Sequence, residues 1–126
     1  MKTALKIPAI AGNVHLGCTA QERARKQQVQ LQIEIYFSKT PRMLTSDNIE
    51  DGPCYAEMSA VAQKTFAKKN YATIEHLCFE CHQALEKYLK KWKSLKKSRL
   101  ITTLLKLRPP IKEITAGSVF TIETKL

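Results

Sequence analysis

The chain has 126 residues, of which 44% are hydrophobic and 25% are charged, the composition of an ordinary globular protein. No apolar run approaches the roughly 18 residues of a membrane span, so we expect a single domain over residues 1–126 with no membrane partner. The formal net charge of +10 indicates anionic partners and says little about the fold.

The N-terminal segment, residues 1–10, places Lys2 and Lys6 around short apolar pieces that Pro8 interrupts. It lacks the continuous apolar core of a secretory signal, which predicts a cytoplasmic protein. Ala4–Ile10 fits a first strand. In the cytoplasm, reduced thiols are expected at all four cysteines, which are Cys18, Cys54, Cys78 and Cys81.

The clearest pattern in the chain lies at Gln28–Phe37, where polar and apolar residues alternate without interruption. This period of two predicts a strand with one buried face. The connections before and after it, residues 11–27 and 38–54, are long. Long structureless loops in a compact domain are more often functional than accidental, so we expect site residues in or beside them.

Two segments with helical spacing follow. Apolar residues recur from Tyr55 to Phe66 and again from Ile74 to Trp92, with a joint near Lys69–Tyr71. This spacing predicts two amphipathic helices. Tyr55 falls on the apolar stripe of the first helix, so a place in the core is the alternative to a functional role for it.

The C-terminal part predicts two more strands, Arg99–Leu107 and Ser118–Thr124, separated by a segment that opens with Pro109 and Pro110. The order strand, strand, helix, helix, strand, strand predicts an α+β fold, in which two helices cover one face of a four-stranded antiparallel sheet. Such a sheet has two open edges. Edge pairing between subunits into a closed barrel is one way to cover them.

Much of the positive charge lies between the second helix and the third strand, at Lys87, Lys90, Lys91, Lys93, Lys96, Lys97 and Arg99. The favoured interpretation is a solvated helix end, where cations complement the negative pole of the helix dipole. Nucleic acid is the alternative partner. Only Tyr88 and Trp92 interleave with these cations, and no recognised binding motif accompanies them, so nucleic acid is not the expected ligand.

The sequence Cys78-Phe79-Glu80-Cys81-His82 has the spacing of covalent haem attachment and, with His76, supplies residue types that bind zinc. Both cysteines share a helical face with Leu77 and Leu85, however. Small core residues are therefore the favoured interpretation, and we expect neither a metal nor a cofactor.

Four residues lie where the expected loops meet regular structure, namely Glu22, Tyr55, Glu75 and Lys106. They belong to a series of short motifs, which are Leu16-Gly17, Glu22-Arg23 and Gln27 before the alternating strand, Asp47-Asn48-Ile49-Glu50-Asp51 before Tyr55, Ile74-Glu75-His76-Leu77, and Lys106-Leu107-Arg108-Pro109-Pro110-Ile111. In this order and with these loop lengths, the chain resembles the dihydroneopterin aldolases over nearly its whole length.

The resemblance implies the tunnelling fold, in which subunits join their sheets into a ring-shaped barrel, commonly as two stacked four-membered rings. It therefore implies a homo-oligomer, a tetramer or an octamer, with active sites between neighbouring subunits. The implied reaction removes glycolaldehyde from 7,8-dihydroneopterin. It leaves 6-hydroxymethyl-7,8-dihydropterin, a folate precursor.

Glu75 and Ile74 are the substrate-binding residues that the resemblance implies. A pterin presents a ring N–H beside a 2-amino group, and one carboxylate can accept from both in a charge-assisted pair. Glu75 lies in the first turn of the second helix, behind Thr73 as a candidate N-cap, where the helix dipole favours a carboxylate. The alternative is that Glu75 only complements this dipole. Ile74 would pack against the pterin ring.

Lys106 is implied as the organiser of proton transfer, through a water near ring atom N5 and the substrate hydroxyl. Retro-aldol cleavage needs a base for that hydroxyl and an acceptor for the electrons of the broken bond. The substrate's own C6=N5 imine is that acceptor, so a metal-independent lyase is expected. Lys106 could serve as an ammonium or as a neutral amine base, and both stay open. An ordinary exposed strand lysine is the alternative.

Tyr55 and Glu22 complete the implied catalytic set. Tyr55 would return a proton to carbon and stack on a neighbouring subunit's pterin, while Glu22 would bind water and orient Lys106. The chain departs from the family at Gly52-Pro53-Cys54, where a Thr or Ser, an aliphatic residue and a polar residue are more usual. Pro53 has no backbone N–H, so any pterin contact there must use its carbonyl.

Two other functions stay open. An epimerase of dihydroneopterin or its triphosphate would use the same residues, because re-addition of glycolaldehyde to the same intermediate inverts one carbon. The paired prolines favour the aldolase, whereas the basic surface would suit a phosphorylated substrate. The third hypothesis is a non-catalytic basic module for nucleic acid, which predicts salt-sensitive oligonucleotide binding and no turnover of pterins.

Overall fold

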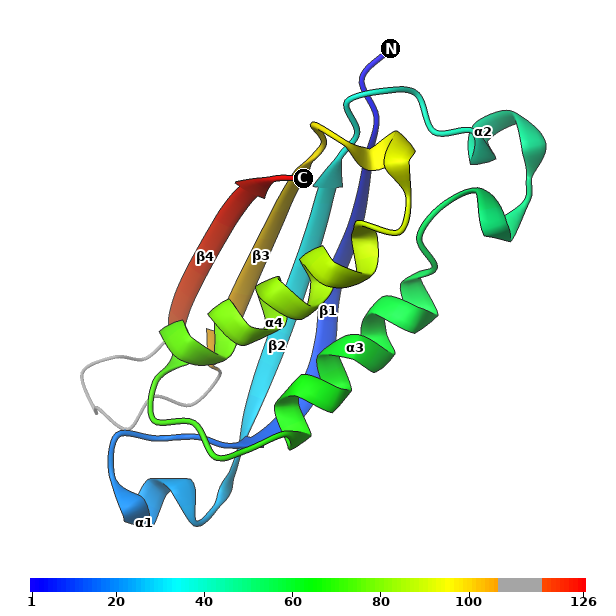
Figure 1. Ribbon diagram of the computed structural model, residues 1–126. Coiled ribbons are helices and arrows are strands. Elements are labelled where there is room, and N and C mark those ends of the chain that lie inside the picture. Colours follow the sequence, from blue (N-terminus) through cyan, green and yellow to red (C-terminus); the bar gives the residue numbers. More distant parts are fainter. Residues whose placement is uncertain (107–116) are drawn as a thin grey trace.

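The computed structural model describes residues 1–106 and 117–126, and this part of the chain contains a four-stranded sheet (Figure 1). The strands are β1 (Ala4–His15), β2 (Lys26–Tyr36), β3 (Arg99–Lys106) and β4 (Ser118–Lys125). They lie in the order β1-β2-β3-β4, and each neighbouring pair is antiparallel. The expected α+β fold with an antiparallel sheet is confirmed.

Alternation along the strands decides which face of the sheet is buried. In β2 the inward-facing residues are Val29, Leu31, Ile33 and Ile35, and all four are buried. The residues between them lie on the opposite face, because successive side chains in a strand alternate in direction. β3 repeats this pattern, and its last inward-facing residue is Lys106.

The first strand is longer than expected, because it runs to His15 instead of ending at Ile10. Its register against β2 shifts between Ile7 and Ile10, and Pro8 lies within this irregularity. A proline is tolerated at a bulge of an edge strand, where its missing N–H costs no ladder hydrogen bond. The prediction of the strand end was wrong because pairing with β2 overrides the weak strand propensity of Ala11-Gly12-Asn13.

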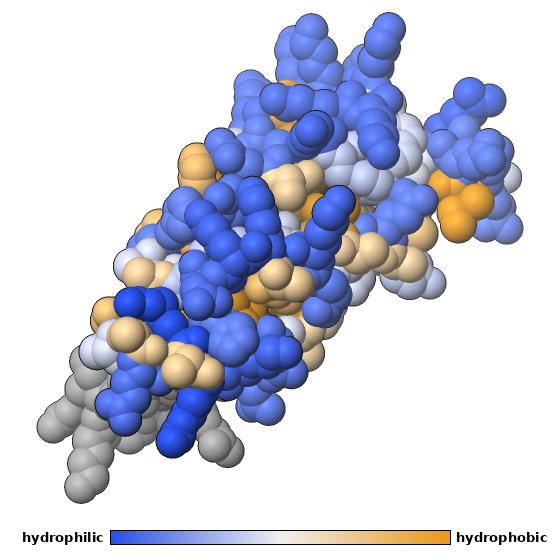
Figure 2. Space-filling model, turned by 60° about the horizontal axis from the view of Figure 1, so that its bottom comes forward, coloured by the Kyte–Doolittle hydropathy of each residue, from blue (hydrophilic) through white to orange (hydrophobic). Residues whose placement is uncertain are grey.

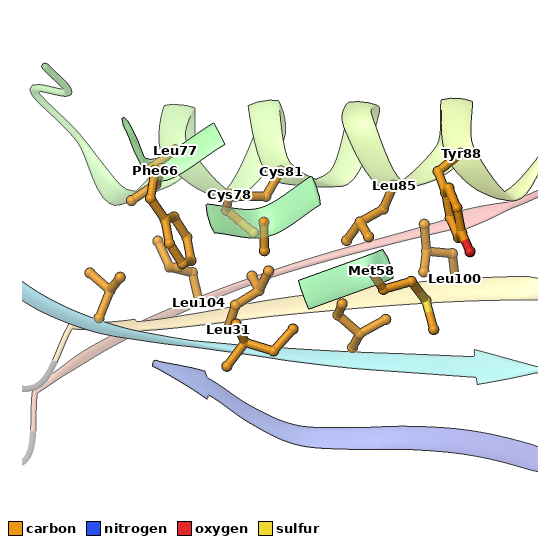
Figure 3. Close-up of a cluster of buried hydrophobic side chains, with 14 of the residues drawn as sticks. Leu31, Met58, Phe66, Leu77, Cys78, Cys81, Leu85, Tyr88, Leu100 and Leu104 are labelled. Atoms are coloured by element: carbon orange, nitrogen blue, oxygen red, sulfur yellow. The ribbon is translucent and has the colours of Figure 1, made fainter. Parts of the chain in front are cut away.

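Helices α3 (Tyr55–Ala67) and α4 (Ile74–Leu89) lie across one face of the sheet, as expected (Figure 1). The second helix ends at Leu89, however, and Trp92 of its expected apolar stripe is the N-cap residue of the turn η2 (Lys93–Leu95) instead. The apolar sides of the two helices pack against the inward-facing strand residues to form a hydrophobic core (Figure 3). Full burial of a leucine or methionine contributes about 1.5–3 kcal/mol, so this core holds the two layers together. Among its fully buried side chains are Leu31, Met58, Leu77, Leu85 and Leu104.

Both long connections contain regular structure, so the expectation of structureless loops was wrong. The first contains the short helix α1 (Ala20–Arg23), and the second contains α2 (Met43–Ser46) and the 3-10 turn η1 (Ile49–Asp51). A further 3-10 turn, η2 (Lys93–Leu95), joins α4 to β3. Single turns of this kind are too short to show a hydrophobic period, which is why the pattern analysis missed them.

The segment after β3, with Leu107, Pro109, Pro110 and Ile111, lies outside the described residues, and the expectations placed on it stay predictions. Within residues 1–106 and 117–126, no helix has the length and apolar character to cross a membrane. The assignment of residues 1–126 to one domain also stays a prediction.

Candidate active site

Lys106 is a nearly buried lysine at the end of β3. It pairs with Val29 of β2 and Ser118 of β4, and it is only 6% exposed. Lysine is seldom buried this far without a charged partner. Its Nζ lies 3.9 Å from Oε2 of Glu22. The alternative of an ordinary exposed strand lysine is therefore wrong, and the structure brings Lys106 and Glu22 together.

Glu22 reaches Lys106 from α1, which begins at a capped turn. Thr19 is the N-cap residue, and its Oγ1 accepts a hydrogen bond from the Glu22 N–H at 3.1 Å. The same hydroxyl donates to Glu22 Oε1 at 3.2 Å. The spacing Thr-x-x-Glu is a sequence signature of such a helix start, and it could have identified Thr19, which sequence analysis missed.

The loop before α1 packs closely around Glu22. A Cβ on Gly17 would collide with the Glu22 side chain, so glycine is needed for this close approach. Arg23 holds the loop, because its Nη1 donates to the carbonyl oxygens of Gly17 at 3.0 Å and Cys18 at 3.1 Å. The Gly17 N–H donates to the carbonyl of Tyr71 at 3.1 Å. These bonds tie the loop of Glu22 to the segment that leads into α4.

Glu75 lies in the first turn of α4, as expected. Thr73 is the N-cap, and its side-chain oxygen accepts from the His76 N–H at 3.2 Å. Glu75 is exposed and Ile74 is half-buried. The positive end of the helix dipole favours the Glu75 carboxylate at this position.

The contacts of His82 show which strands lie under the side of α4 that carries Glu75. These residues are seven positions apart, which returns the helix to the same face after two turns. The ring nitrogens of His82 lie 2.8 Å from Thr102 Oγ1 of β3 and 2.7 Å from Thr124 Oγ1 of β4. The face of α4 that carries Glu75 therefore lies over β3 and β4.

The start of α4 lies at the Lys106 end of these strands. Cys78, one turn nearer the start than His82, approaches the carbonyl oxygen of Phe120 at 3.7 Å. Ser118, which pairs with Lys106, comes next along the inner face of β4 in the same direction. Lys106, Glu22 and the first turn of α4 thus lie at one end of the molecule.

The start of α3, with Tyr55 and the preceding Pro53, lies beside the end of α4 and so at the other end of the helix pair. Tyr55 begins α3, and the N–H of Cys54 just before it donates to the hydroxyl of Tyr88 near the end of α4, at 3.1 Å. From Glu75 to Tyr88, α4 rises about 20 Å at 1.5 Å per residue. A single copy of the chain therefore does not bring Tyr55 or Pro53 to the residues around Lys106.

Tyr55 is 71% exposed, so the alternative that placed it on the buried stripe of α3 is wrong. The buried stripe begins one turn later, at Met58, and continues through Ala62 and Phe66. A periodic pattern does not show where the sheet and α4 stop covering the helix, and Tyr55 lies beyond the part of α3 that they cover. Pro53, in contrast, is buried.

Cys78 and Cys81 are fully buried, which confirms their interpretation as core residues. Burial raises the pKa of Cys78 to about 11 and that of Cys81 to about 12. Metal binding needs a thiolate and haem attachment needs an accessible thiol, and these positions favour neither. Across the described ranges, no group of three or more His, Cys, Asp or Glu residues is arranged to hold a metal ion.

The lysines that follow α4 border an open groove of about 350 Å³ with an apolar floor. Trp92 in this groove is already engaged, because its Nε1 donates to the Glu50 carbonyl at 3.3 Å and its ring meets Tyr88 edge-on. It offers little free surface for stacking a nucleic-acid base. Figure 2 shows a mostly hydrophilic face, as expected for solvated charges. The groove is lined by Leu89, Lys90, Trp92, Lys93, Leu95, Lys96 and Leu126.

Comparison with known proteins gives matches over nearly the whole chain. The model of the dihydroneopterin aldolase (FolB) family matches residues 5–123. A curated relative from Chlamydia pneumoniae, named "Probable dihydroneopterin aldolase", is 31% identical over 111 residues, which are 88% of this chain and 80% of the relative.

Solved structures share the fold. The FolB protein of Vibrio cholerae O1 biovar El Tor matches with a TM-score of 0.83 at 17% identity, over 98% of each chain. The E. coli dihydroneopterin aldolase in complex with neopterin matches with a TM-score of 0.77 at 19% identity, over 97% of this chain and 98% of the other. At these identities the likeness shows the four-stranded sheet and its helix layer.

Proposed function

The chain belongs to the dihydroneopterin aldolase family, and from that premise we propose that it cleaves 7,8-dihydroneopterin by a retro-aldol reaction. The products are glycolaldehyde and 6-hydroxymethyl-7,8-dihydropterin, a precursor of folate. The observation that carries this proposal is the Lys106–Glu22 pair, 3.9 Å apart, with the lysine only 6% exposed. A buried amine held by one carboxylate is suited to organise proton transfer, as an ammonium or as an amine base.

Glu75 and Ile74 bind the pterin in this proposal. The Glu75 carboxylate is exposed, and among the ion pairs of the described residues none involves it. It is therefore available to accept from the ring N–H and the 2-amino group together. Half-buried Ile74 offers an apolar contact for the flat ring.

The reaction needs a base, an electron acceptor and a proton donor. Lys106 as a neutral amine, or a water that Lys106 and Glu22 hold, takes the proton from the hydroxyl on the side-chain carbon that leaves as glycolaldehyde. The electron pair of the carbon–carbon bond that breaks moves into the C6=N5 imine, N5 takes up a proton, and glycolaldehyde leaves. Tyr55 then donates a proton to the remaining carbon, and N5 loses its proton as the imine forms again. Because the ring accepts the electrons, no metal and no cofactor are required.

Two copies of the chain build each site in this proposal. Within one copy Tyr55 is 71% exposed and lies about 20 Å along the helix pair from Glu75. The Tyr55 of one copy therefore meets the pterin held by Glu75 and Lys106 of another, and the carbonyl of Pro53 approaches the same pterin. A closed ring of identical copies repeats this contact at every site. We propose a cytoplasmic homotetramer or homo-octamer in which the sheets join into a barrel.

The direct test is incubation of the purified protein with 7,8-dihydroneopterin and a metal chelator, followed by chromatographic separation of the products. We expect glycolaldehyde and 6-hydroxymethyl-7,8-dihydropterin in equal amounts. Loss of turnover on chelation, with recovery on addition of a divalent cation, would contradict metal independence. An epimerised pterin without glycolaldehyde would favour the epimerase. Oligonucleotide binding without pterin turnover would favour the nucleic-acid module.

A further inference from the structure

The start of α3 has no cap of its own. Cys54 is the N-cap residue, and its side chain makes no capping hydrogen bond. The first N–H groups of a helix have no partner within the helix and need one from elsewhere. Tyr88 of α4 supplies it, because its hydroxyl accepts from the Cys54 N–H at 3.1 Å and donates to Oε2 of Glu57 at 2.5 Å.

The Tyr88 side chain is itself held in place. It is only 6% exposed, and Figure 3 shows it directed from α4 toward the sheet. Its ring lies edge-on to Trp92 with centroids 5.1 Å apart, and Lys91 Nζ lies over its ring, 5.1 Å from the centroid. Burial, together with the hydrogen bond to Glu57, raises the pKa of Tyr88 to about 12. The hydroxyl therefore stays protonated at neutral pH and donates a hydrogen bond to Glu57.

Tyr55 depends on this anchor, because it lies between the two residues that Tyr88 holds, Cys54 and Glu57. We propose that Tyr88 is a positioning residue, which sets the direction in which Tyr55 reaches the pterin of a neighbouring copy. Tyr55 is 71% exposed and is not fixed by its own burial. This inference rests on the proposed function. In that function α4 serves two sites, with Glu75 at its start and Tyr88 near its end.

Displacement of Tyr55 affects one step of the reaction more than the others. Bond cleavage depends on Lys106 and Glu22, whereas the proton for the remaining carbon comes from Tyr55. When that proton is delayed, the carbon that remains attached to the pterin attacks the aldehyde carbon of glycolaldehyde before glycolaldehyde leaves the site. The new alkoxide then takes up a proton. The carbon–carbon bond re-forms without any redox change, and addition to the other face of the aldehyde gives an epimer. A misplaced Tyr55 therefore raises the ratio of epimerisation to cleavage.

Tyr88→Phe tests the inference, because it removes one hydroxyl and keeps the packed ring. We expect the kcat for cleavage to fall about 10- to 100-fold, the cost of a small misplacement of a reacting group. The KM for 7,8-dihydroneopterin should stay within about twofold, because Glu75 and Ile74 are unchanged. The epimer-to-cleavage ratio should rise. Hydrogen exchange of the Cys54 amide should become faster in the intact oligomer.

Matched variants separate positioning from a general loss of stability. Tyr36→Phe also removes a hydroxyl that donates to a carboxylate, Glu34 Oε2 at 2.8 Å, and should leave kcat and the product ratio unchanged. Glu57→Gln keeps an oxygen that accepts from Tyr88 and should stay close to the wild type. Glu57→Ala loses this acceptor and should change the product ratio in the same direction as Tyr88→Phe.

The inference is overturned by a folded Tyr88→Phe enzyme whose kcat and product ratio match the wild type. It is also overturned by a fall in kcat that only tracks the fraction of folded protein, with an unchanged product ratio and unchanged amide exchange at Cys54. The wild type is measured in the same assay. A wild type that does not cleave the pterin contradicts the proposed function, whereas normal cleavage by both proteins contradicts only the role of Tyr88.

Discussion

Lys106 is buried, and its ammonium form is costly at such a position unless the charge has a partner. A buried ion that loses its partner destabilises a protein by about 3–5 kcal/mol. Here Glu22 lies 3.9 Å away and is held by the cap at Thr19 and by the close approach of Gly17. The Thr19 cap and the Gly17 contact thus hold Glu22 beside an amine at a position where an apolar residue would pack more simply.

Replacing Lys106 by methionine should remove proton transfer while keeping most of the packing. We expect kcat to fall by about 10²- to 10⁴-fold, the usual contribution of a general acid or base, with little change in pterin affinity. Steady-state kinetics and fluorescence titration with a pterin would measure the two effects separately. Lys125→Met, at the exposed end of β4, is the matched control. Equal losses of affinity and turnover would argue against a role confined to catalysis.

Glu75→Gln should act mainly on pterin binding. A hydrogen bond to a charged group contributes about 1.5–3 kcal/mol, so affinity should weaken by about 10- to 100-fold. A pterin titration checks this value. Glu123→Gln is the control, because Glu123 pairs with Arg99 at 3.3 Å on the face of the sheet away from the helices. Unchanged affinity in Glu75→Gln would show that this carboxylate only complements the helix dipole.

At the scale of elements, β1 and α3 meet at a close contact. A Cβ on Gly12 would collide with the ring of Phe66, so the strand and helix could not keep their separation. We expect Gly12→Ala to lower the free energy of unfolding by about 1–3 kcal/mol, the cost of overpacking a core. Chemical denaturation measures this change. Ala11→Ser, on the exposed side of the same strand, should change it by less than about 0.5 kcal/mol.

A buried polar network joins α4 to β3 and β4. His82 is 2% exposed, its ring nitrogens approach Thr102 and Thr124, and Nε2 lies 3.1 Å from Oε1 of Glu86. Thr124 donates to Glu86 at 3.0 Å, so its oxygen can accept from Nε2–H while Thr102 donates to Nδ1. Burial lowers the pKa of His82 from 6.5, and Glu86 opposes this shift only in part.

This network predicts a loss of stability in acid. Because the pKa of His82 is lower in the folded chain than its unfolded value of 6.5, the unfolded chain binds more protons below that pH. The contribution of neutral His82 to the free energy of unfolding is fully present above about pH 6.5. It is lost as the pH falls, by at most about 1.4 kcal/mol per pH unit. Denaturation between pH 7.5 and pH 5 should show a shallower slope for His82→Gln than for the wild type. Gln83→Ala, which changes an exposed side chain of the same helix that does not titrate, should keep the wild-type slope.

At the scale of the whole molecule, the candidate residues divide between two ends. Lys106, Glu22 and Glu75 lie at one end, and Tyr55 and Pro53 lie at the other. A site that needs both groups forms only where two copies meet. In the proposed function, oligomerisation is therefore a condition for activity and not only a source of stability.

Mixing two inactive variants tests this arrangement. A Lys106→Met chain keeps Tyr55, and a Tyr55→Phe chain keeps Lys106, so a mixed oligomer contains some sites with both residues intact. Random assembly of equal amounts should restore about a quarter of the wild-type cleavage activity. Product analysis after joint refolding measures the recovery, and each variant refolded alone is the control. No recovery in oligomers shown to be mixed would place both residues in the site of a single copy.

The regular elements and part of the site were predictable because their signals are local. Alternation at Gln28–Phe37 follows from the direction of successive side chains, and the helical spacing that begins at Ile74 follows from the helix period. The cap at Thr73 is equally local and placed Glu75 in a first turn. The same kind of signal at Thr19 was present and was missed.

Other features depend on contacts between segments that are far apart in the chain. The strand extension to His15 depends on pairing with β2, and the burial of Lys106 depends on its pairing with Val29 and on the loop that brings Glu22 to it. The exposure of Tyr55 and its anchor at Tyr88 depend on where α4 ends. The amino-acid order settled the periods of the elements and the residue types for the chemistry, because backbone geometry acts between neighbours. The burial of these residues, their partners and the separation of Tyr55 from Lys106 were settled by packing, since they come from side chains that meet only after the sheet and helices have assembled.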